Sequence, residues 1–419
     1  MVSEHIPRVI IIGGGAAGFF GAIACAENLK SKADINILES GSHFLTKVKI
    51  SGGGRCNVTH EMEDKINFVG YYPRGKRELI GPLSRWGQED TVWWFKENGV
   101  ELKTESDGRV FPFSDSSQTV INCLTDTAKE KKIKLNNKCR VNRIVKPDDG
   151  SFKIWVNKQK DPILADYLLL ATGGIRSASS RNLLESVGHE FSSPVPSLFT
   201  FEIDDDKLIE LSGLSLSSAC VGIESLGIKS TGPLLITHWG ISGPVVLKLS
   251  ALGARELEQV NYQFKIQLNW LGEDWSFQKL CKIMESERNK KGARKILKKS
   301  PLKEIPNRLW SRIALKAGTD EEQTWSELTK ERAANIVNLL ITEEFLVSGK
   351  SLNKEEFVTC GGVLLRNVDL RTMESRLVRN LFFAGEVMDI DGLTGGFNFQ
   401  SAWTTGRIAG EEIALRCCT

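Results

Sequence analysis

Residues 8–23 read RVIIIGGGAAGFFGAI, and they give the strongest indication of the fold class. Residues 8–12 are mostly β-branched without alternation, which is typical of a strand buried on both faces of a parallel sheet. Glycines at 13, 15 and 18 follow in G-x-G-x-x-G spacing, and a helical stretch over 19–29 comes next. A second strand over 34–38 ends at Glu39, 21 positions after Gly18. This β-α-β unit predicts a Rossmann-type fold that binds a dinucleotide.

Each glycine of this motif has a separate task. Gly13 permits the turn from strand to helix, Gly15 lets the backbone approach a pyrophosphate, and Gly18 lets the helix lie close to the strand. The pyrophosphate is expected at the N-terminal end of the helix, with Glu39 accepting hydrogen bonds from the adenosine ribose. A tight turn without a ligand is the alternative, and the presence of Glu39 argues against it.

A second glycine-rich stretch lies near the C-terminus. Residues 381–410 read LFFAGEVMDIDGLTGGFNFQSAWTTGRIAG, a short apolar strand followed by Gly385-Glu386, more glycines and a helix. A late strand–glycine–helix segment is typical of glutathione-reductase-like flavoproteins, so the pair of stretches predicts FAD. Glu386 is expected to hold the ribityl hydroxyls. The helix starting near Gly396 is expected to point its amides at the flavin N1–C2=O edge, where negative charge develops on reduction.

A third stretch, KVKISGGGRCN over 47–57, combines three glycines with cations. Such a loop can wrap around an extended cofactor, with Arg55 contacting a phosphate or a flavin carbonyl. A surface loop is the alternative. Cys56 has no second cysteine a few residues away, as a flavin disulfide reductase would need, so a structural role is favoured over a redox role.

Composition sets further limits. The 419 residues carry a net charge of only +3, which argues against a stable nucleic-acid partner or a membrane partner, although 287–303 (ERNKKGARKILKKSPLK) is a strongly basic run. The nine cysteines show no metal-binding spacing, and no apolar run suits a signal peptide or a membrane span. No metal and a cytoplasmic location are therefore expected. A second G-x-G-x-x-G is missing, which argues against a stable, separate NAD(P)H domain.

The pattern of elements predicts four sequence segments. Residues 1–193 and 355–419 form the two parts of an α/β, Rossmann-type, FAD-binding domain. Residues 194–275 alternate between apolar and polar and are expected to form an inserted antiparallel β-barrel-like substrate domain. Residues 276–354 are expected to be a helical bridging segment.

These motifs closely resemble the BaiN/YhiN-type, aminoacetone-oxidase-like family of FAD-dependent oxidoreductases. The resemblance runs nearly end to end, through IIIGGGAAG, KVKISGGGRCNVT, DGRVFPFSD, LLLATGG, GPLLITHWGISGPVVLKLS, VTCGGV and the C-terminal stretch. It implies the same domain plan, FAD as cofactor and NAD(P)H as a candidate transient donor. The cofactor-binding residues predicted from motifs and resemblance together are Gly13, Gly15, Ala16, Ala17, Gly18, Glu39, Ser40, Lys47, Ser51, Gly52, Gly53, Gly54, Arg55, Cys56, Asn57, Val141, Ala171, Thr172, Gly173, Gly174, Gly385, Glu386, Gly395, Gly396, Phe397 and Asn398.

The chain also departs from the family pattern. Residues 175–182 (IRSASSRN) lack the usual glycine and proline, His60 replaces a residue that is often Asn, and Ser116-Ser117 replace a usual Lys-Ala pair. His238 is the candidate catalytic acid/base, and a structural histidine is the alternative. Arg109 is either an anion contact or part of a surface salt bridge.

The leading hypothesis is an enzyme that moves a hydride between flavin and a small organic substrate. Whether it is a reductase or an oxidase stays open, as do the substrate, the nicotinamide and the oligomeric state. A flavoprotein that acts on or binds tRNA is the second hypothesis, and a non-catalytic flavin redox sensor is the third.

Overall fold

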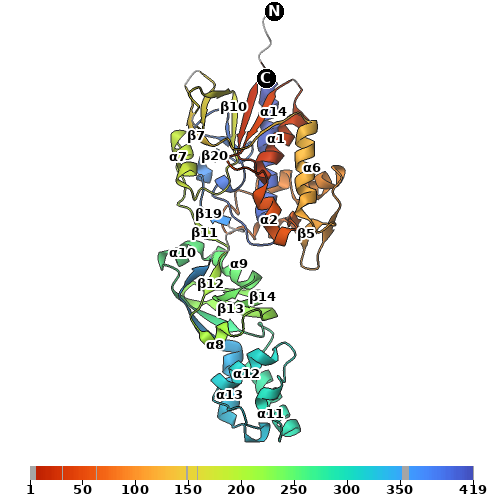
Figure 1. Ribbon diagram of the computed structural model, residues 1–419, viewed down its shortest axis with the longest axis vertical. Helices are drawn as coiled ribbons and strands as arrows, with labels where there is room; N and C mark the ends of the chain where they lie inside the picture. The colour runs from red at the N-terminus through yellow and green to blue at the C-terminus, as the bar shows by residue number, and fades with distance from the viewer. Residues whose placement is uncertain are drawn as a thin grey trace, which may run out of the picture. The chain divides into compact units, whose positions relative to one another are not determined.

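The chain divides into two compact units. In the computed structural model, unit 1 comprises Met1–Pro196 and Lys354–Thr419, and unit 2 comprises Ser197–Asn353 (Figure 1). The structure describes residues 6–30, 32–62, 64–147, 150–157, 159–351 and 358–418. Across these residues, no helix combines the length and the apolar character that crossing a membrane requires.

The centre of unit 1 is a seven-stranded sheet in the order β20-β21-β22-β10-β1-β2-β6. Five of its strands run parallel: β22 (Leu381–Phe383), β10 (Tyr167–Leu170), β1 (Arg8–Ile12), β2 (Asp34–Leu38) and β6 (Lys134–Asn136). The edge strands β20 (Val368–Asp369) and β21 (Glu374–Ser375) are antiparallel. Strands 8–12 and 34–38 are where the sequence predicts them, and the late strand β22 pairs with β10. The predicted Rossmann-type sheet is therefore confirmed.

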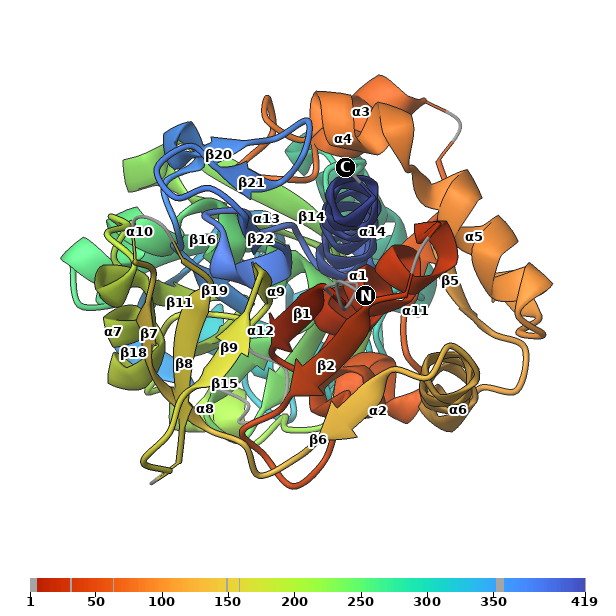
Figure 2. The same ribbon diagram turned by 90° about the horizontal axis from the view of Figure 1, so that it is seen from above.

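Two helices from opposite ends of the chain pack together on one face of this sheet (Figure 2). They are α1 (Ala16–Asn28) and α14 (Phe397–Cys417). Glycines make the close approach possible: a Cβ built on Gly406 would lie 2.6 Å from the Ala17 carbonyl oxygen, and one on Gly410 would lie 2.2 Å from the Gly21 oxygen. This contact joins the N-terminal and the C-terminal glycine-rich stretches in one unit.

Smaller elements complete unit 1. One antiparallel sheet is formed by β7 (Val141–Val145), β8 (Phe152–Val156) and β9 (Ile163–Ala165), and it lies on the face of the parallel sheet opposite α1 (Figure 2). A second is formed by β3 (Thr59–His60), β5 (Arg109–Pro112) and β4 (Leu102–Thr104), and a third by β11 (Val195–Ser197) and β19 (Val358–Cys360). The remaining helices are α2 (Thr46–Gly54), α3 (Lys65–Val69), α4 (Ile80–Arg85), α5 (Gln88–Glu97), α6 (Ser117–Glu130) and α7 (Ala178–Ser186).

Unit 2 is built on a seven-stranded antiparallel sheet. Its order is β17 (Glu343–Val347), β16 (Phe264–Asn269), β13 (Ser215–Ile223), β14 (Ile228–Thr237), β15 (Gly240–Ser242), β12 (Thr200–Glu202) and β18 (Gly349–Ser351). The first and last strands of this order are consecutive in the chain, with only Ser348 between them. The antiparallel strands agree with the sequence prediction, and closure into a barrel stays a prediction.

The helices of unit 2 are α8 (Asp206–Ile209), α9 (Pro244–Leu252), α10 (Ala254–Gln259), α11 (Phe277–Lys291), α12 (Asn307–Lys316) and α13 (Lys330–Thr342). The helical segment expected over 276–354 ends at Thr342, and β17 and β18 follow it. Residues 343–347 (EEFLV) alternate between buried and exposed, which is the period of a strand pairing at a sheet edge. The core of unit 2 therefore includes both the sheet and the helices α11–α13.

A buried ion group lies inside unit 2. The Glu343 side chain is only 1% exposed, and its carboxylate accepts hydrogen bonds from Arg312 at 2.9 Å, Lys316 at 2.8 Å and Trp270 Nε1 at 2.7 Å. Arg312 also pairs with Asp205 at 3.1 Å. Because each partner neutralises the other in a buried setting, the group holds β17 against α12 and β16.

Candidate functional site

The G-x-G-x-x-G turn connects β1 to α1 in unit 1. Gly13 has φ +112°, and its N–H donates to the Leu38 carbonyl at 2.9 Å. A Cβ built on Gly18 would lie 2.0 Å from the Gly13 oxygen, so only glycine lets α1 approach the strand this closely. Gly15, in contrast, has no atom within 4 Å of a built Cβ. The N-terminal end of α1 is thus open at the position where the motif predicts a pyrophosphate.

Glu39 lies directly after β2 and beside this turn. Its carboxylate accepts hydrogen bonds from the Gly14 N–H at 2.9 Å and the Gly41 N–H at 2.6 Å, while the Ser40 hydroxyl lies at 3.2 Å. Two fixed amides orient the carboxylate and leave it further lone pairs. Residues 138–141 lie beside Glu39, because the Cys139 N–H donates to the Glu39 carbonyl. Buried Val141 follows at the start of β7.

The loop after β10 lies against the same turn. Ala171 N–H donates to the Ile12 carbonyl, and a Cβ built on Gly13 would lie 2.2 Å from the Ala171 oxygen. Thr172, Gly173 and Gly174 continue from there toward Glu386. A Cβ built on Gly174 would lie 3.0 Å from Glu386 Oε1, which shows how closely this loop approaches the carboxylate.

Glu386 connects three distant segments. Its Oε1 accepts from the Thr359 N–H at 2.8 Å, and its Oε2 pairs with Lys47 Nζ at 2.5 Å. Gly385 precedes Glu386, and its N–H donates to Thr405 Oγ1 at 2.9 Å. This bond links the end of β22 to α14. The predicted residues Lys47 and Glu386 are therefore in direct contact. Thr359 is a contact of Glu386 that the sequence prediction did not include, although VTCGGV was recognised as a motif.

The SGGGRCN loop has an unusual backbone. Gly52, Gly53 and Gly54 have φ of +58°, +69° and +84°, and Cys56 has φ +64°. No atom lies within 4 Å of a Cβ built on Gly53 or Gly54, so the loop presents bare backbone to open space. Ser51 ends the helical part of α2, and its carbonyl accepts from Cys56 N–H at 3.0 Å. Burial raises the pKa of the Cys56 thiol to about 12, so the thiol stays protonated at neutral pH.

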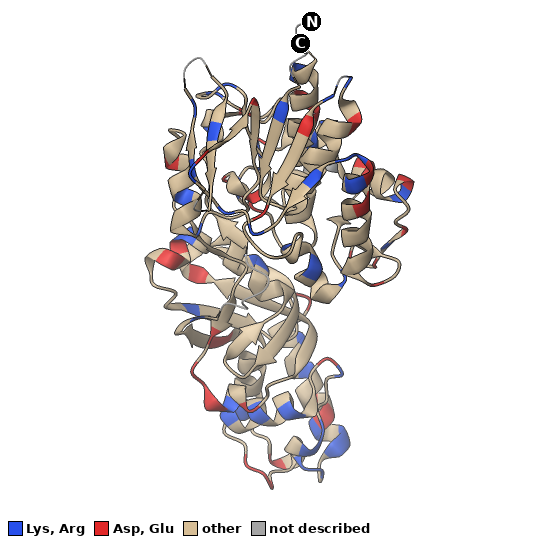
Figure 3. Cartoon of the chain, turned by 45° about the horizontal axis from the view of Figure 1, so that its top comes forward, with Lys and Arg blue, Asp and Glu red and all other residues tan. Residues whose placement is uncertain are grey.

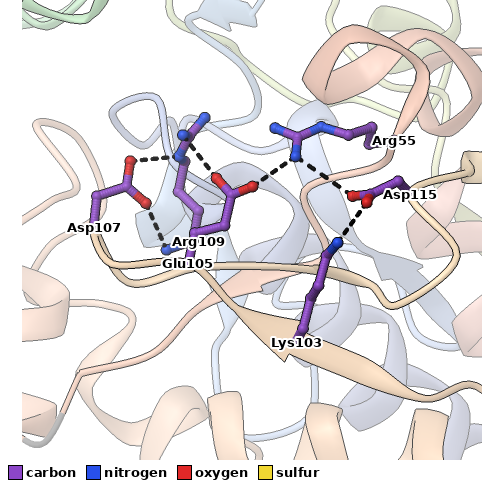
Figure 4. Close-up of polar contacts among 6 residues, drawn as sticks. All are labelled: Arg55, Lys103, Glu105, Asp107, Arg109 and Asp115. Carbon is purple, nitrogen blue, oxygen red and sulfur yellow. Dashed lines mark hydrogen bonds and ion pairs between the residues drawn. The ribbon is translucent and has the colours of Figure 1, made fainter.

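Arg55 belongs to a chain of ion pairs beside this loop (Figure 4). Its guanidinium pairs with Glu105 at 2.6 Å and with Asp115 at 3.5 Å, and it lies 3.9 Å from the centre of the Phe111 ring. Arg109 pairs with the other oxygen of Glu105 and with Asp107. Of the two predictions for Arg109, the structure supports the salt bridge. These contacts hold the outer side of the loop through Arg55, whose predicted contact with FAD stays a prediction.

The N-terminus of α14 forms the far end of the site. Gly396 has φ +99°, and a Cβ built there would lie 2.5 Å from the Thr59 carbonyl oxygen and 2.9 Å from Asn57 Oδ1. The Asn398 side chain closes the preceding loop by bonding both the N–H and the carbonyl of Gly392. His60 Nδ1 lies 3.0 Å from the Gly395 carbonyl. The family departure at His60 therefore lies in contact with the site.

Phe397 packs inward from the same turn. Its ring stacks on Tyr71 with centroids 4.5 Å apart and on His60 at 4.8 Å, and the residue is 1% exposed. The helix start is therefore anchored by an aromatic stack. Ala16 and Ala17 lie in the first turn of α1, and Gly385 and Gly406 of the C-terminal segment lie against Ala17.

His238 lies in unit 2, at the exposed tip of the hairpin between β14 and β15. Its ring meets the Trp239 ring edge at 4.1 Å between centroids. None of the described residues hydrogen-bonds to its ring nitrogens, so the structure gives no support to a loop-holding role. In the ranges the structure describes, no group of three His, Cys, Asp or Glu side chains could hold a metal ion.

Comparison with known proteins identifies the family. Residues 7–412 match the family described as the HI0933-like protein Rossmann domain. The chain is 29% identical to a 3-dehydro-bile acid delta(4,6)-reductase of Clostridium scindens, covering 98% of this chain and 99% of that protein. It is 29% identical to a ribosomal RNA dihydrouridine synthase of Haemophilus influenzae, covering 94% and 96%, and 26% identical to the Escherichia coli protein of the same name, covering 96% and 97%.

Solved structures agree on the fold. The 3-ketosteroid-delta4-(5alpha)-dehydrogenase of Rhodococcus jostii superposes with a TM-score of 0.52 at 14% identity, over 99% of this chain and 98% of that chain. The match to the family model covers nearly the whole sequence, and the resemblance seen in the motifs is confirmed. The chain belongs to the HI0933-like Rossmann family and is an FAD-dependent oxidoreductase.

Proposed function

We propose that this enzyme reduces a carbon–carbon double bond conjugated with a carbonyl group in a small organic substrate. The observation that carries the proposal is a set of three backbone elements in unit 1: the open turn at Gly15, the open loop at Gly53-Gly54 and the N-terminus of α14, which no side chain caps. Together they suit one FAD held along its length, with the α1 end at the diphosphate and the α14 end at the flavin.

The type of bond comes from the relatives. A bile acid with a 3-oxo group and 4,6 double bonds is an enone, and uracil carries a C5=C6 bond next to its C4 carbonyl. The named activities of both relatives therefore describe the saturation of a double bond activated by a carbonyl. Such a bond accepts a hydride at one carbon and a proton at its neighbour, which is chemistry that reduced flavin supports.

The residues of the chain have separate parts in this reaction. FAD, when bound, supplies the hydride from N5. Lys47 and Glu386 are proposed to hold the ribityl chain, and Glu39 the adenosine ribose. The amides at the start of α14 are proposed to stabilise negative charge at N1–C2=O of the reduced ring. His238 is the proposed proton donor, because the residue is exposed and none of the described residues hydrogen-bonds to its ring.

The test separates the two half-reactions. Without oxygen, the oxidised purified holoenzyme is mixed in separate samples with NADH, NADPH or an amine to test flavin reduction. The holoenzyme reduced by NADH or NADPH is then mixed with a 3-oxo-Δ4 steroid or with oxygen. We expect the enone to reoxidise the flavin with one equivalent of saturated product, because its β-carbon accepts the hydride. In the variant His238→Gln, flavin reduction should be unchanged, while reoxidation by the enone should slow by about 100-fold. If oxygen alone reoxidised the flavin rapidly, or if the amine reduced the flavin, the enzyme would be an oxidase and the proposed reductase activity would be wrong.

A second candidate is action on uracil in RNA, and a specific surface favours it. Residues 288–303 contain eight Lys or Arg and no Asp or Glu. Lys291 and Lys295 pair with Glu287 and Glu322. The other six are exposed and have no acidic partner among the described residues: Arg288, Lys290, Arg294, Lys298, Lys299 and Lys303. Figure 3 shows Lys and Arg of the chain in blue and Asp and Glu in red. Unpaired cations of this density suit a phosphate backbone.

RNA binding is measured with a ribosomal RNA fragment at several salt concentrations. If the second candidate is right, the triple variant Lys290→Glu, Arg294→Glu, Lys298→Glu should bind at least about 10-fold more weakly, and the log–log salt slope should fall by about one per lost phosphate contact. The matched control is the reversal of the exposed lysines at 129, 131 and 132 at the end of α6. Equal binding by both triple variants would remove this candidate.

A further inference from the structure

Asn57 is a buried polar side chain that the fold leaves without a partner. The residue is 8% exposed, and its Oδ1 has no hydrogen-bond partner among the described residues. Buried carbonyl oxygens are almost always hydrogen-bonded, because removal from water is otherwise not compensated. A lone buried acceptor at a candidate site therefore indicates a donor supplied by a ligand.

The position of Asn57 defines which ligand atoms it can meet. Asn57 Oδ1 lies 2.9 Å from a Cβ built on Gly396, and the Asn57 Cβ lies 3.6 Å from one built on Gly52. The side chain thus stands between the SGGG loop and the start of α14. The first backbone N–H groups of α14 have no acceptor within their own helix, so a group outside the helix must accept their hydrogen bonds. The unpaired acceptor of Asn57 therefore lies beside Gly396, the residue that precedes the first turn of α14.

This pattern matches one edge of the flavin ring. The pyrimidine edge presents C2=O, N3–H and C4=O in succession, which is an acceptor, a donor and an acceptor. We propose that Asn57 is a positioning residue for FAD: its Oδ1 accepts a hydrogen bond from flavin N3–H, while the α14 amides donate to the adjacent C2 carbonyl. The inference rests on the proposed placement of FAD in unit 1. Because N3–H donates and the neighbouring C2=O accepts, the two hydrogen bonds together fix how the flavin ring is rotated within its plane.

The test compares FAD with 3-deaza-FAD, in which a C–H replaces N3–H at the same size. Dissociation constants are measured by flavin fluorescence on the apoprotein of wild type and of Asn57→Leu. We expect wild type to bind 3-deaza-FAD about 10-fold more weakly than FAD, and Asn57→Leu to bind both equally, at the level of the weaker complex. Asn57→Asp, which keeps only acceptors, should still prefer FAD.

Asn98→Leu is the matched control, because the Asn98 amide already bonds the Trp94 carbonyl at 2.8 Å within the protein. It should retain the wild-type preference for FAD. If Asn57→Leu still prefers FAD, or Asn57→Asp loses the preference, Asn57 does not accept from N3–H and the inference is overturned. Failure of the wild-type apoprotein to bind either flavin would instead remove the proposed placement of FAD. The wild-type comparison of the two flavins needs no variant, so a folding defect cannot hide the result.

Discussion

Replacement of Gly15 by valine is expected to weaken FAD binding by at least about 100-fold, while the free energy of unfolding of the apoprotein changes by only about 1 kcal/mol. Gly15 has φ −95° and ψ −168°, an extended conformation that valine adopts readily, and no protein atom lies within 4 Å of the new Cβ. The branched side chain would instead fill the space where the backbone must approach the diphosphate. The valine side chain would clash with the diphosphate. It would also prevent the charge-assisted hydrogen bonds from the backbone N–H groups to the phosphates.

Gly81→Val is the matched control for this variant. Gly81 in α4 also has no atom within 4 Å of a built Cβ, but it lies outside the predicted motifs. Flavin retained on purification and the dissociation constant of FAD are measured for both variants, beside chemical denaturation of the apoproteins. Wild-type retention of FAD by Gly15→Val would show that the diphosphate does not lie at the start of α1.

Replacement of Glu343 by leucine is expected to lower the stability of unit 2 by about 3–5 kcal/mol. Arg312, whose side chain is 6% exposed, donates through Nη1 to both Glu343 oxygens. It would lose this carboxylate and keep Asp205 as its acidic partner. The indole N–H of Trp270 would also lose its acceptor. A buried cation without compensation is one of the few causes of so large an effect from a single substitution.

Denaturation followed by circular dichroism and by limited proteolysis gives the stability of this unit. The double variant Arg312→Met with Glu343→Leu should recover much of the loss, because it removes both charges. Glu210→Leu breaks the exposed pair with Lys207 and should change stability by only about 0.5 kcal/mol. If the single Glu343 variant were as stable as Glu210→Leu, the ion group would not stabilise β17 against α12.

The cofactor motifs could be read from the sequence because their chemistry is local. Gly13, Gly15 and Gly18 act through backbone geometry that their spacing already determines, and Glu39 follows at the end of the next strand. The structure packs the N-terminal glycine-rich stretch against the C-terminal one through α1 and α14, and it pairs Lys47 with Glu386. The strand at 8–12 followed from its unbroken β-branched run, and the strand at 34–38 from its place in the β-α-β unit that ends at Glu39.

Contacts between side chains that are far apart in the sequence could not be predicted from local motifs. The Lys47–Glu386 pair spans 339 positions, and Thr359 donates to Glu386 from a strand whose role no spacing rule reveals. Arg55 has the chemistry for a phosphate contact, yet two carboxylates from the β4–β5 region surround it. Strand β17 lies within the segment that the sequence predicted to be helical. It was missed because a short alternating segment forms a strand only when a neighbouring strand pairs with it.

The Rossmann-type unit, the cofactor class and the family can be predicted from the sequence alone, since they depend on backbone conformations encoded over a few adjacent residues. The tertiary structure was needed to find that Asn57 Oδ1 lies beside Gly396 without a partner among the described residues, and that His238 lies exposed on a hairpin of unit 2. Burial and hydrogen-bond satisfaction are properties of residues brought together from distant parts of the chain, and no local pattern carries them.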